Sequence, residues 1–127
     1  MMNDLIIEST DRTPAIRFIR HTLSFEIEGE SYPEDVAAFY GQVIPAIEQW
    51  QQSEATSLKV CINLIYINSS SMKALYRIFD VLDQGRASGK QVSVMWGYVE
   101  DDDVMQELGE DFRDRFPELA VELKVTD

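Results

Sequence analysis

The sequence predicts an α/β protein with a single domain, built on a mixed β-sheet with helices packed against it. Its 127 residues are close to the commonest size of one domain. Short apolar runs typical of strands alternate with longer stretches whose apolar residues recur at helical spacing. No repeat, low-complexity tract or linker divides the chain, so we expect residues 1–127 to form one unit. The predicted order of elements is β-β-α-β-α-β-α-β, and helices between strands are typical of crossovers in such a sheet.

The first predicted elements are a β-hairpin and a helix. Apolar runs at Ala15–Ile19 and Leu23–Ile27 flank the short polar segment 20–22, which predicts a turn between two strands. A helix should follow as far as about Gln52, because its apolar residues form one stripe. Its start is predicted at Ser31–Glu34, where Ser followed three residues later by Glu is spaced for a capping box.

The most apolar stretch, Leu58–Ile67, predicts the central strand. One face would carry Val60, Ile62, Leu64 and Tyr66, and the other Cys61, Asn63, Ile65 and Ile67. A strand that is apolar on both faces is usually covered by helices on both sides, so we expect a three-layer arrangement here. Asn63 is the polar exception, and we expect it to bond a neighbouring loop.

The remaining elements continue the alternation. In chain order they are a helix after Asn68–Ser71, a strand at Gln91–Tyr98, a helix beginning at Asp101–Asp103 and a short edge strand at Leu119–Val125. The first of these helices should end at Gly85 or Gly89, since glycine favours a helix C-terminus. The three aspartates favour a helix start because their charges suit its positive end.

The charge of the chain restricts its partners. Eleven Lys and Arg against 23 Asp and Glu give a net charge of −12, which disfavours nucleic acids and anionic membrane surfaces. The apolar runs are too short to span a bilayer and the start does not resemble a signal peptide, so we expect a cytoplasmic protein. Much of the acidity lies from Glu100 onward, either as a solvated helix face or as a docking surface for a basic partner.

The residues that usually perform catalysis are scarce, so we expect no enzyme activity, no metal and no cofactor. The only histidine, His21, falls in the predicted hairpin turn, and no serine lies in a nucleophile motif. The glycines form no phosphate-binding loop. The single cysteine, Cys61, cannot form an internal disulfide or a cysteine-based zinc site, and we expect it to be a small buried hydrophobe.

Three consecutive hydroxyls, Ser69–Ser71, stand where the central strand meets the next helix. One of them could cap the helix by accepting a backbone N–H bond. A phosphate at the same place would meet free N–H groups and the positive end of the helix, and would add about −1.5 to −2 charge. The residues alone therefore leave open a structural cap, a phosphorylation switch, and a small-molecule- or anion-binding site at Asn68–Ser71.

Four segments resemble the SiaC family of bacterial regulatory phosphoproteins. They are Ser31-Tyr32-Pro33-Glu34, the run from Tyr66 to Lys73, Ile78-Phe79-Asp80, and the run from Gly89 to Tyr98. The resemblance implies a STAS-like fold, similar to anti-sigma-factor antagonists, and a partner-switching role in biofilm regulation. It implies that the effector is a diguanylate cyclase. The unphosphorylated form would bind and activate this cyclase, which raises the level of cyclic di-GMP. It also implies a dedicated serine/threonine kinase and a PPM-type phosphatase.

The resemblance also implies roles for single residues. The family phosphoacceptor is the Thr of a Tyr-Leu-Asn-Thr-Ser-Ser motif, which falls on Ser69, with Ser70 as second choice because three serines adjoin. Asn68 and Ser70 would shape the loop, and Ser71 is a candidate N-cap. The implied partner contacts are Asn68, Ser70, Ser71, Lys73, Tyr32 and Asp80. Lys73 would face a phosphate or an acidic partner, although it could equally be an ordinary exposed lysine, and Asp80 could be a plain exposed helix residue.

Overall fold

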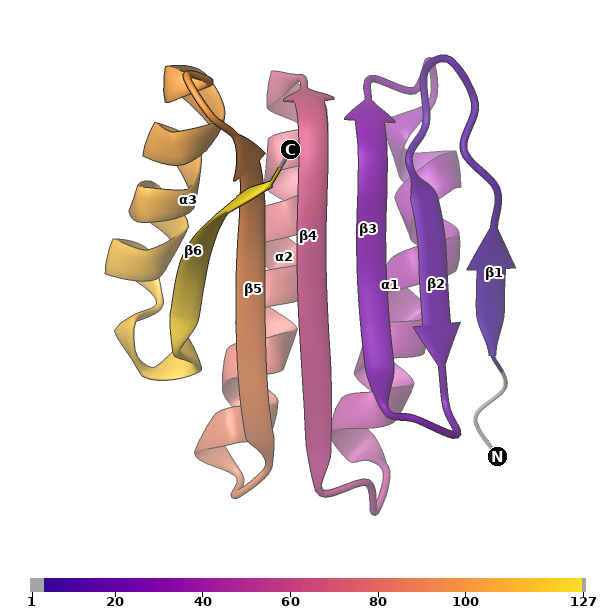
Figure 1. The fold of residues 1–127 in the computed structure, drawn as a ribbon. Coiled ribbons are helices and arrows are strands. Elements are labelled where there is room, and N and C mark those ends of the chain that lie inside the picture. Colours follow the sequence, from indigo (N-terminus) through magenta and orange to yellow (C-terminus); the bar gives the residue numbers. More distant parts are fainter. Residues whose placement is uncertain (1–3, 127) are drawn as a thin grey trace.

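The computed structural model describes residues 4–126 and contains one six-stranded sheet (Figure 1). The strands lie side by side in chain order: β1 (Leu5–Ile7), β2 (Ala15–Ile19), β3 (Ser24–Ser31), β4 (Ser57–Ile67), β5 (Gln91–Val99) and β6 (Val121–Thr126). Neighbours among β1, β2 and β3 are antiparallel, whereas β3, β4, β5 and β6 run parallel. The predicted α/β class, the hairpin and the mixed sheet are confirmed.

One strand was not predicted. β1 has only three residues and pairs with β2, so it is too short to show a period of two in the sequence. The preceding Asp4 helps to hold it, because its Oδ1 accepts the backbone N–H of Arg20 at 2.7 Å. β1 and β6 are the two edges of the sheet, which confirms the edge position predicted for the last strand.

All three α-helices, α1 (Val36–Gln52), α2 (Ser69–Ala87) and α3 (Asp103–Arg115), cover the same face of the sheet (Figure 1). A 3-10 turn, η1 (Pro117–Leu119), links α3 to β6. Each helix connects a parallel strand to the next one in the same direction across the sheet, and crossovers of one hand then place every helix on one side. None of the helices in residues 4–126 is long and apolar enough to cross a bilayer.

The prediction that helices cover both faces of the central strand is therefore wrong. On β4 the side chains that face the helices are buried, whereas Cys61 and Asn63 are half-buried and Ile65 is 66% exposed on the other face. Their apolar character suggested a second covering layer that the topology does not supply. The face of the sheet that carries Cys61, Asn63 and Ile65 is therefore open to solvent, and it is called the uncovered face below.

Two predicted helix boundaries also need correction. α1 begins after Asp35, whose Oδ1 accepts the N–H of Ala38 at 3.0 Å, so no capping box forms at Ser31–Glu34. Of the two glycines predicted to end α2, Gly85 is wrong, because the helix continues past it and a Cβ there would come within 2.7 Å of the Trp50 ring. Gly89 is confirmed, since it directly follows the C-cap Ser88 and has a positive φ of 111°. The start of α3 is confirmed, since Asp102 caps it through the N–H of Met105 at 3.1 Å.

The core between sheet and helices is organised around two buried tryptophans. Trp50 donates its indole N–H to the Ser57 carbonyl at 2.9 Å, and Trp96 donates to the Met105 carbonyl at 3.0 Å. Gly109 on α3 leaves room for the Trp96 ring, which a Cβ would approach within 2.5 Å. Each ring therefore ties a helix to the sheet while its one polar group is satisfied.

Candidate functional site

The candidate site lies at the edge of the sheet where the parallel strands end, here called the carboxyl edge. The carboxyl ends of β3, β4 and β5 meet at the top of Figure 1, together with the start of α2 and the loop between β1 and β2. In open α/β sheets, ligands usually bind outside the carboxyl ends of the strands. The predicted serine run falls at its centre, directly after β4.

The first turn of α2 is capped by Asn68. Its Oδ1 accepts the N–H of Ser71 at 2.9 Å, so the prediction that Ser71 is the N-cap is wrong. The amide oxygen of Asn68, one residue before the helix, accepts the N–H of the third helical residue. The serine hydroxyls are therefore not needed to cap the helix. Ser69 and Ser70 occupy the first two helical positions and both are exposed. Their backbone N–H groups are among those that no helical carbonyl can reach.

The third serine belongs to the core. Ser71 is fully buried, so the prediction that it contacts a partner is wrong for this structure, and it cannot be an accessible phosphoacceptor. Its Oγ faces the Tyr40 hydroxyl and, among the residues that the structure describes, has no hydrogen-bond partner of good geometry. Within residues 4–126 that leaves Ser69 and Ser70 as the hydroxyls of the run that solvent and a kinase can reach.

Beneath the serine run lies a buried hydroxyl cluster formed by Ser31, Tyr40 and Ser71. The hydroxyls of Ser31 and Tyr40 are 2.6 Å apart, and both residues are buried. Burial raises the pKa of Tyr40 above its usual range, and the hydroxyls of Ser31 and Ser71 oppose this rise by stabilising the phenolate. The cluster joins the end of β3, the second turn of α1 and the start of α2, and so fixes the position of the α2 N-terminus.

An aromatic pair borders the exposed serines. Tyr32 and Tyr66 meet edge to face with ring centroids 5.7 Å apart, and the backbone N–H of Asn68 donates to the Ser31 carbonyl at 3.0 Å. The predicted neighbourhood of Tyr32 and the serine run is therefore present in the structure. The prediction that Tyr66 shares a face with Val60, Ile62 and Leu64 is wrong, because those three side chains are buried and Tyr66 is 49% exposed.

A register shift explains the exposure of Tyr66. Gly29 pairs with Leu64, but the next residue, Glu30, pairs with Tyr66, so Ile65 is an extra residue in β4. This bulge exchanges the faces of the residues that follow: Ile67 returns to the core at 7% exposure and Tyr66 leaves it. Strict alternation read from β4 fails at this point, where Gly29 on the facing strand β3 has a positive φ of 122°.

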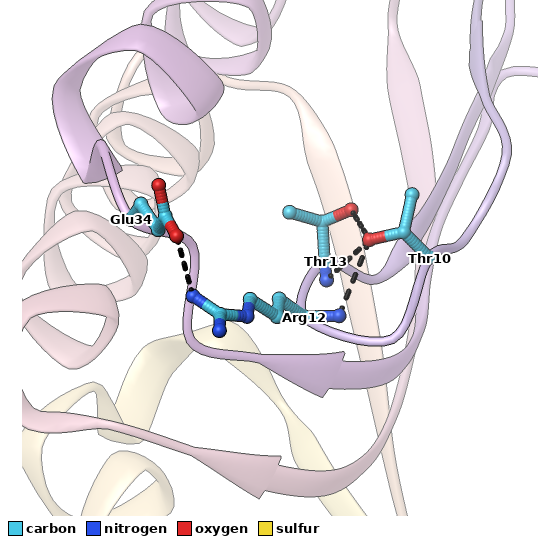
Figure 2. Close-up of polar contacts among 4 residues, drawn as sticks. All are labelled: Thr10, Arg12, Thr13 and Glu34. Atoms are coloured by element: carbon cyan, nitrogen blue, oxygen red, sulfur yellow. Dashed lines mark hydrogen bonds and ion pairs between the residues drawn. The ribbon is translucent and has the colours of Figure 1, made fainter.

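Two loops are joined next to the aromatic pair. Arg12 Nη1 lies 2.8 Å from Glu34 Oε1, and the Thr10 hydroxyl accepts the N–H groups of Arg12 and Thr13 at 3.2 and 3.0 Å (Figure 2). Arg12 and Glu34 are both largely exposed, so this ion pair adds little to stability, about 0–1 kcal/mol. Its effect is local, because it holds the β1–β2 loop against the loop that carries Tyr32. The capping role predicted for Glu34 is wrong.

The two remaining predicted contacts differ in position. Lys73 is exposed one turn after Ser69 on α2 and, within residues 4–126, forms no ion pair. Asp80 is also exposed, but it lies further along α2, about 16 Å from Ser69 at 1.5 Å per residue. A surface centred on Ser69 therefore includes Lys73 more readily than Asp80.

The groups that usually perform catalysis lie elsewhere. His21 is exposed in the turn between β2 and β3, at the end of the sheet opposite to Ser69 (Figure 1). Burial raises the pKa of the Cys61 thiol, and the nearby carboxylates of Glu26 and Glu28 raise it further, so the thiol is protonated at neutral pH. Within residues 4–126, no group of three or more His, Cys, Asp or Glu is placed to hold a metal ion.

Comparison with known proteins supports the family that the sequence resembles. The model of the SiaC family regulatory phosphoproteins matches residues 7–126. An uncharacterized protein of Pseudomonas aeruginosa strain UCBPP-PA14 is 35% identical over 113 residues, covering 89% of this chain and 90% of the relative.

Solved structures agree with this match. A chain in the crystal structure of the diguanylate cyclase SiaD in complex with its activator SiaC from Pseudomonas aeruginosa has a TM-score of 0.92 and 32% identity, covering 97% of this chain and 100% of that one. Apo-SiaC from the same organism has a TM-score of 0.85 and 32% identity, covering 99% and 100%. The fold of this chain is thus that of SiaC. The chain belongs to the SiaC family of regulatory phosphoproteins.

Proposed function

We propose that the chain is a non-catalytic partner switch whose unphosphorylated form binds and activates a diguanylate cyclase of the SiaD kind. The observation that carries this proposal is the likeness to SiaC as it occurs in complex with SiaD, with a TM-score of 0.92 over 97% of this chain. That SiaC chain is matched over 100% of its length, so the part of the complex that accompanies the cyclase corresponds to this chain. Activation then depends on contact with the cyclase.

Ser69 is the proposed phosphoacceptor, with Ser70 as second choice. Ser69 is exposed at the first position of α2, and Asn68 already provides the helix cap. A phosphate on Ser69 would add about −1.5 to −2 charge beside free N–H groups at the positive end of the helix. Lys73, exposed one turn further along α2, would attract either that phosphate or an acidic group of a partner.

The phosphate would act on the partner instead of on the fold. Tyr32 and Tyr66 form an aromatic surface beside the serines, and a partner that covers it removes water from its surroundings. A phosphate needs that water, so modification at the border of such a contact opposes binding through the cost of desolvation. We infer that a dedicated serine/threonine kinase and a PPM-type phosphatase set the fraction of the chain that is modified.

The test uses purified chain and purified SiaD of Pseudomonas aeruginosa. The wild type and Ser69→Ala should bind the cyclase and raise its rate of cyclic di-GMP synthesis, whereas Ser69→Glu should bind at least tenfold more weakly. Ser70→Glu is the matched control, since it places the same charge one residue away. Loss of binding in Ser70→Glu alone would move the acceptor to Ser70.

A wild type that neither binds nor activates the cyclase would refute the proposal. Phosphopeptide mapping of the chain from its native host then decides the modification itself. Phosphate on Ser69 is the expected result, and a peptide that stays unmodified in both starved and fed cells would contradict the switch.

A further inference from the structure

The uncovered face of the sheet has a hollow at the carboxyl edge. It has a volume of about 420 Å³ and is lined by Glu28, Asn63, Ile65, Gly97, Val99 and Thr126 on four neighbouring strands. Glu28 pairs with Asn63 and Asn63 with Gly97 across the sheet, which places them in one row. Gly97 has no side chain and the Asn63 amide lies over it at the floor of the hollow, so that a Cβ at position 97 would meet Asn63 Oδ1 at 1.8 Å.

The walls of the hollow are apolar side chains that the fold leaves in solvent. Ile65 is 66% exposed and Val99 is 50% exposed. Six large apolar or aromatic side chains are largely exposed in the part of the chain that the structure describes, and five of them lie at the carboxyl edge: Ile65, Tyr66, Val99, Val104 and Val125. Apolar side chains gathered at one edge mark an interaction surface better than scattered ones do.

The floor of the hollow carries a second signal. Asn63 Oδ1 is buried and accepts no hydrogen bond within residues 4–126, while the amide nitrogen makes only a long contact of 3.4 Å with Cys61 Sγ. The expected bond from Asn63 to a loop is absent from the described structure. A buried acceptor without a donor costs free energy, and a donor from a bound partner that reaches the floor would remove that cost.

The border of the hollow is acidic. Glu28 lines it, Glu30 pairs with Tyr66 beside Ile65, and Glu100 and Asp101 follow Val99 directly. None of these carboxylates forms an ion pair within residues 4–126. Lys124, which pairs with Gly97, is the cation on this row. Apolar walls with an acidic border fit a protein segment that has an apolar face flanked by Lys or Arg.

We propose that this hollow, with Ile65 and Val99 as its walls, receives an apolar side chain of the cyclase, presented by a segment whose basic residues face Glu28 and Glu100. This inference rests on the proposed function, because the partner is the one proposed above. Ile65 is four residues before Ser69, a chain distance of at most about 14 Å. A phosphate on Ser69 therefore stands at the border of the docked segment, where carboxylates and apolar groups both oppose it.

The test measures the affinity of purified SiaD of Pseudomonas aeruginosa for variants of the full chain. Ile65→Asp and Val99→Asp should each weaken binding at least tenfold, as expected when a central apolar contact is lost. Ile6→Asp is the matched control. Ile6 is 52% exposed and lies on β1, the outer strand that is separated from the hollow by β2. Its change should alter the affinity less than twofold. Circular-dichroism melting confirms that the variants fold.

The charges are tested by the association rate at low and high salt. Glu28→Gln with Glu100→Gln should lower the rate at low salt several-fold and reduce its salt dependence, whereas Glu107→Gln with Glu118→Gln, on α3 and η1, should not. If the wild type and the Asp variants bind SiaD equally well while Ser69→Glu does not, the hollow is not the docking surface and the proposed function stands. A wild-type homodimer that Ile65→Asp dissociates would instead assign the surface to a second copy of the chain, and would also overturn the inference.

Discussion

Removal of the Tyr40 hydroxyl should destabilise the fold at the buried hydroxyl cluster beneath the serine run. In Tyr40→Phe, the Ser31 hydroxyl loses its partner at 2.6 Å while it stays fully buried. A buried hydrogen bond is worth about 1 kcal/mol net, and a hydroxyl left without a partner costs about 1–3 kcal/mol. The phenyl ring keeps its packing, so we expect the free energy of unfolding to fall by about 1–3 kcal/mol.

A double-mutant cycle separates the hydrogen bond from packing. Ser31→Ala removes the other partner, and the double variant leaves no orphaned hydroxyl at this pair, so it should be less destabilised than the sum of the single variants by about 1–2 kcal/mol. Urea unfolding at pH 7 measures this through the fluorescence of the buried Trp50 and Trp96. Additivity of the two changes within about 0.5 kcal/mol would refute the reasoning.

The same cluster makes stability sensitive to alkaline pH. Burial raises the pKa of Tyr40 in the folded state above the ordinary value of 10.0, and the hydroxyls of Ser31 and Ser71 lower it by less. The stabilisation is therefore complete below pH 10 and is lost as pH rises from there through the folded-state pKa, because the unfolded chain releases the proton first. The advantage of the wild type over Tyr40→Phe should shrink above pH 10, and a constant difference between them would contradict the raised pKa.

Three further changes test the surroundings of the site. Asn68→Ala removes the acceptor for the N–H of Ser71 and should cost about 1 kcal/mol in urea unfolding, with Asn68→Asp as the control that keeps a cap; equal loss in both would contradict the capping role. Gly97→Ala drives a Cβ into Asn63 and should cost about 1–3 kcal/mol, which Asn63→Ala should largely restore, and a failure of that rescue would place the strain elsewhere. Burial raises the pKa of the Cys61 thiol, so it should react with a disulfide reagent at pH 7.5 more slowly than glutathione does, and a faster reaction would show an activated thiolate.

Most of the framework follows from the sequence because the periodicity is strong. Five of the six strands in residues 4–126 and all three of the α-helices there were predicted, since their apolar residues recur at a period of two or at helical spacing over many residues. The exception, β1, has three residues and is held by pairing with β2 and by Asp4, which are contacts between distant parts of the chain. The uncovered face of the sheet was missed for a similar reason, because exposed Ile65 and half-buried Cys61 have the same apolar character as core residues.

The site was predicted less completely than the fold. The serine run was located because three hydroxyls at a strand-to-helix junction exceed what one cap needs. The roles within the run depend on which nearby side-chain oxygen accepts a free N–H group in the first turn of α2. That oxygen belongs to Asn68, which precedes all three serines. The bulge at Ile65, which exposes Tyr66, follows from the pairing of β4 with β3 and has no signature in β4 alone.

The serine run divides structural roles from the regulatory role proposed above among adjacent residues. Asn68 caps α2 and Ser71 packs in the core, so both take part in holding the helix in place. Ser69 and Ser70 do neither, because their side chains form no hydrogen bond within the described chain and are exposed. A phosphate on Ser69 therefore breaks no contact of the fold, and its charge is felt by whatever lies against the carboxyl edge. A reversible switch needs this arrangement, since a modification that unfolded the helix would change the amount of folded protein instead of its choice of partner.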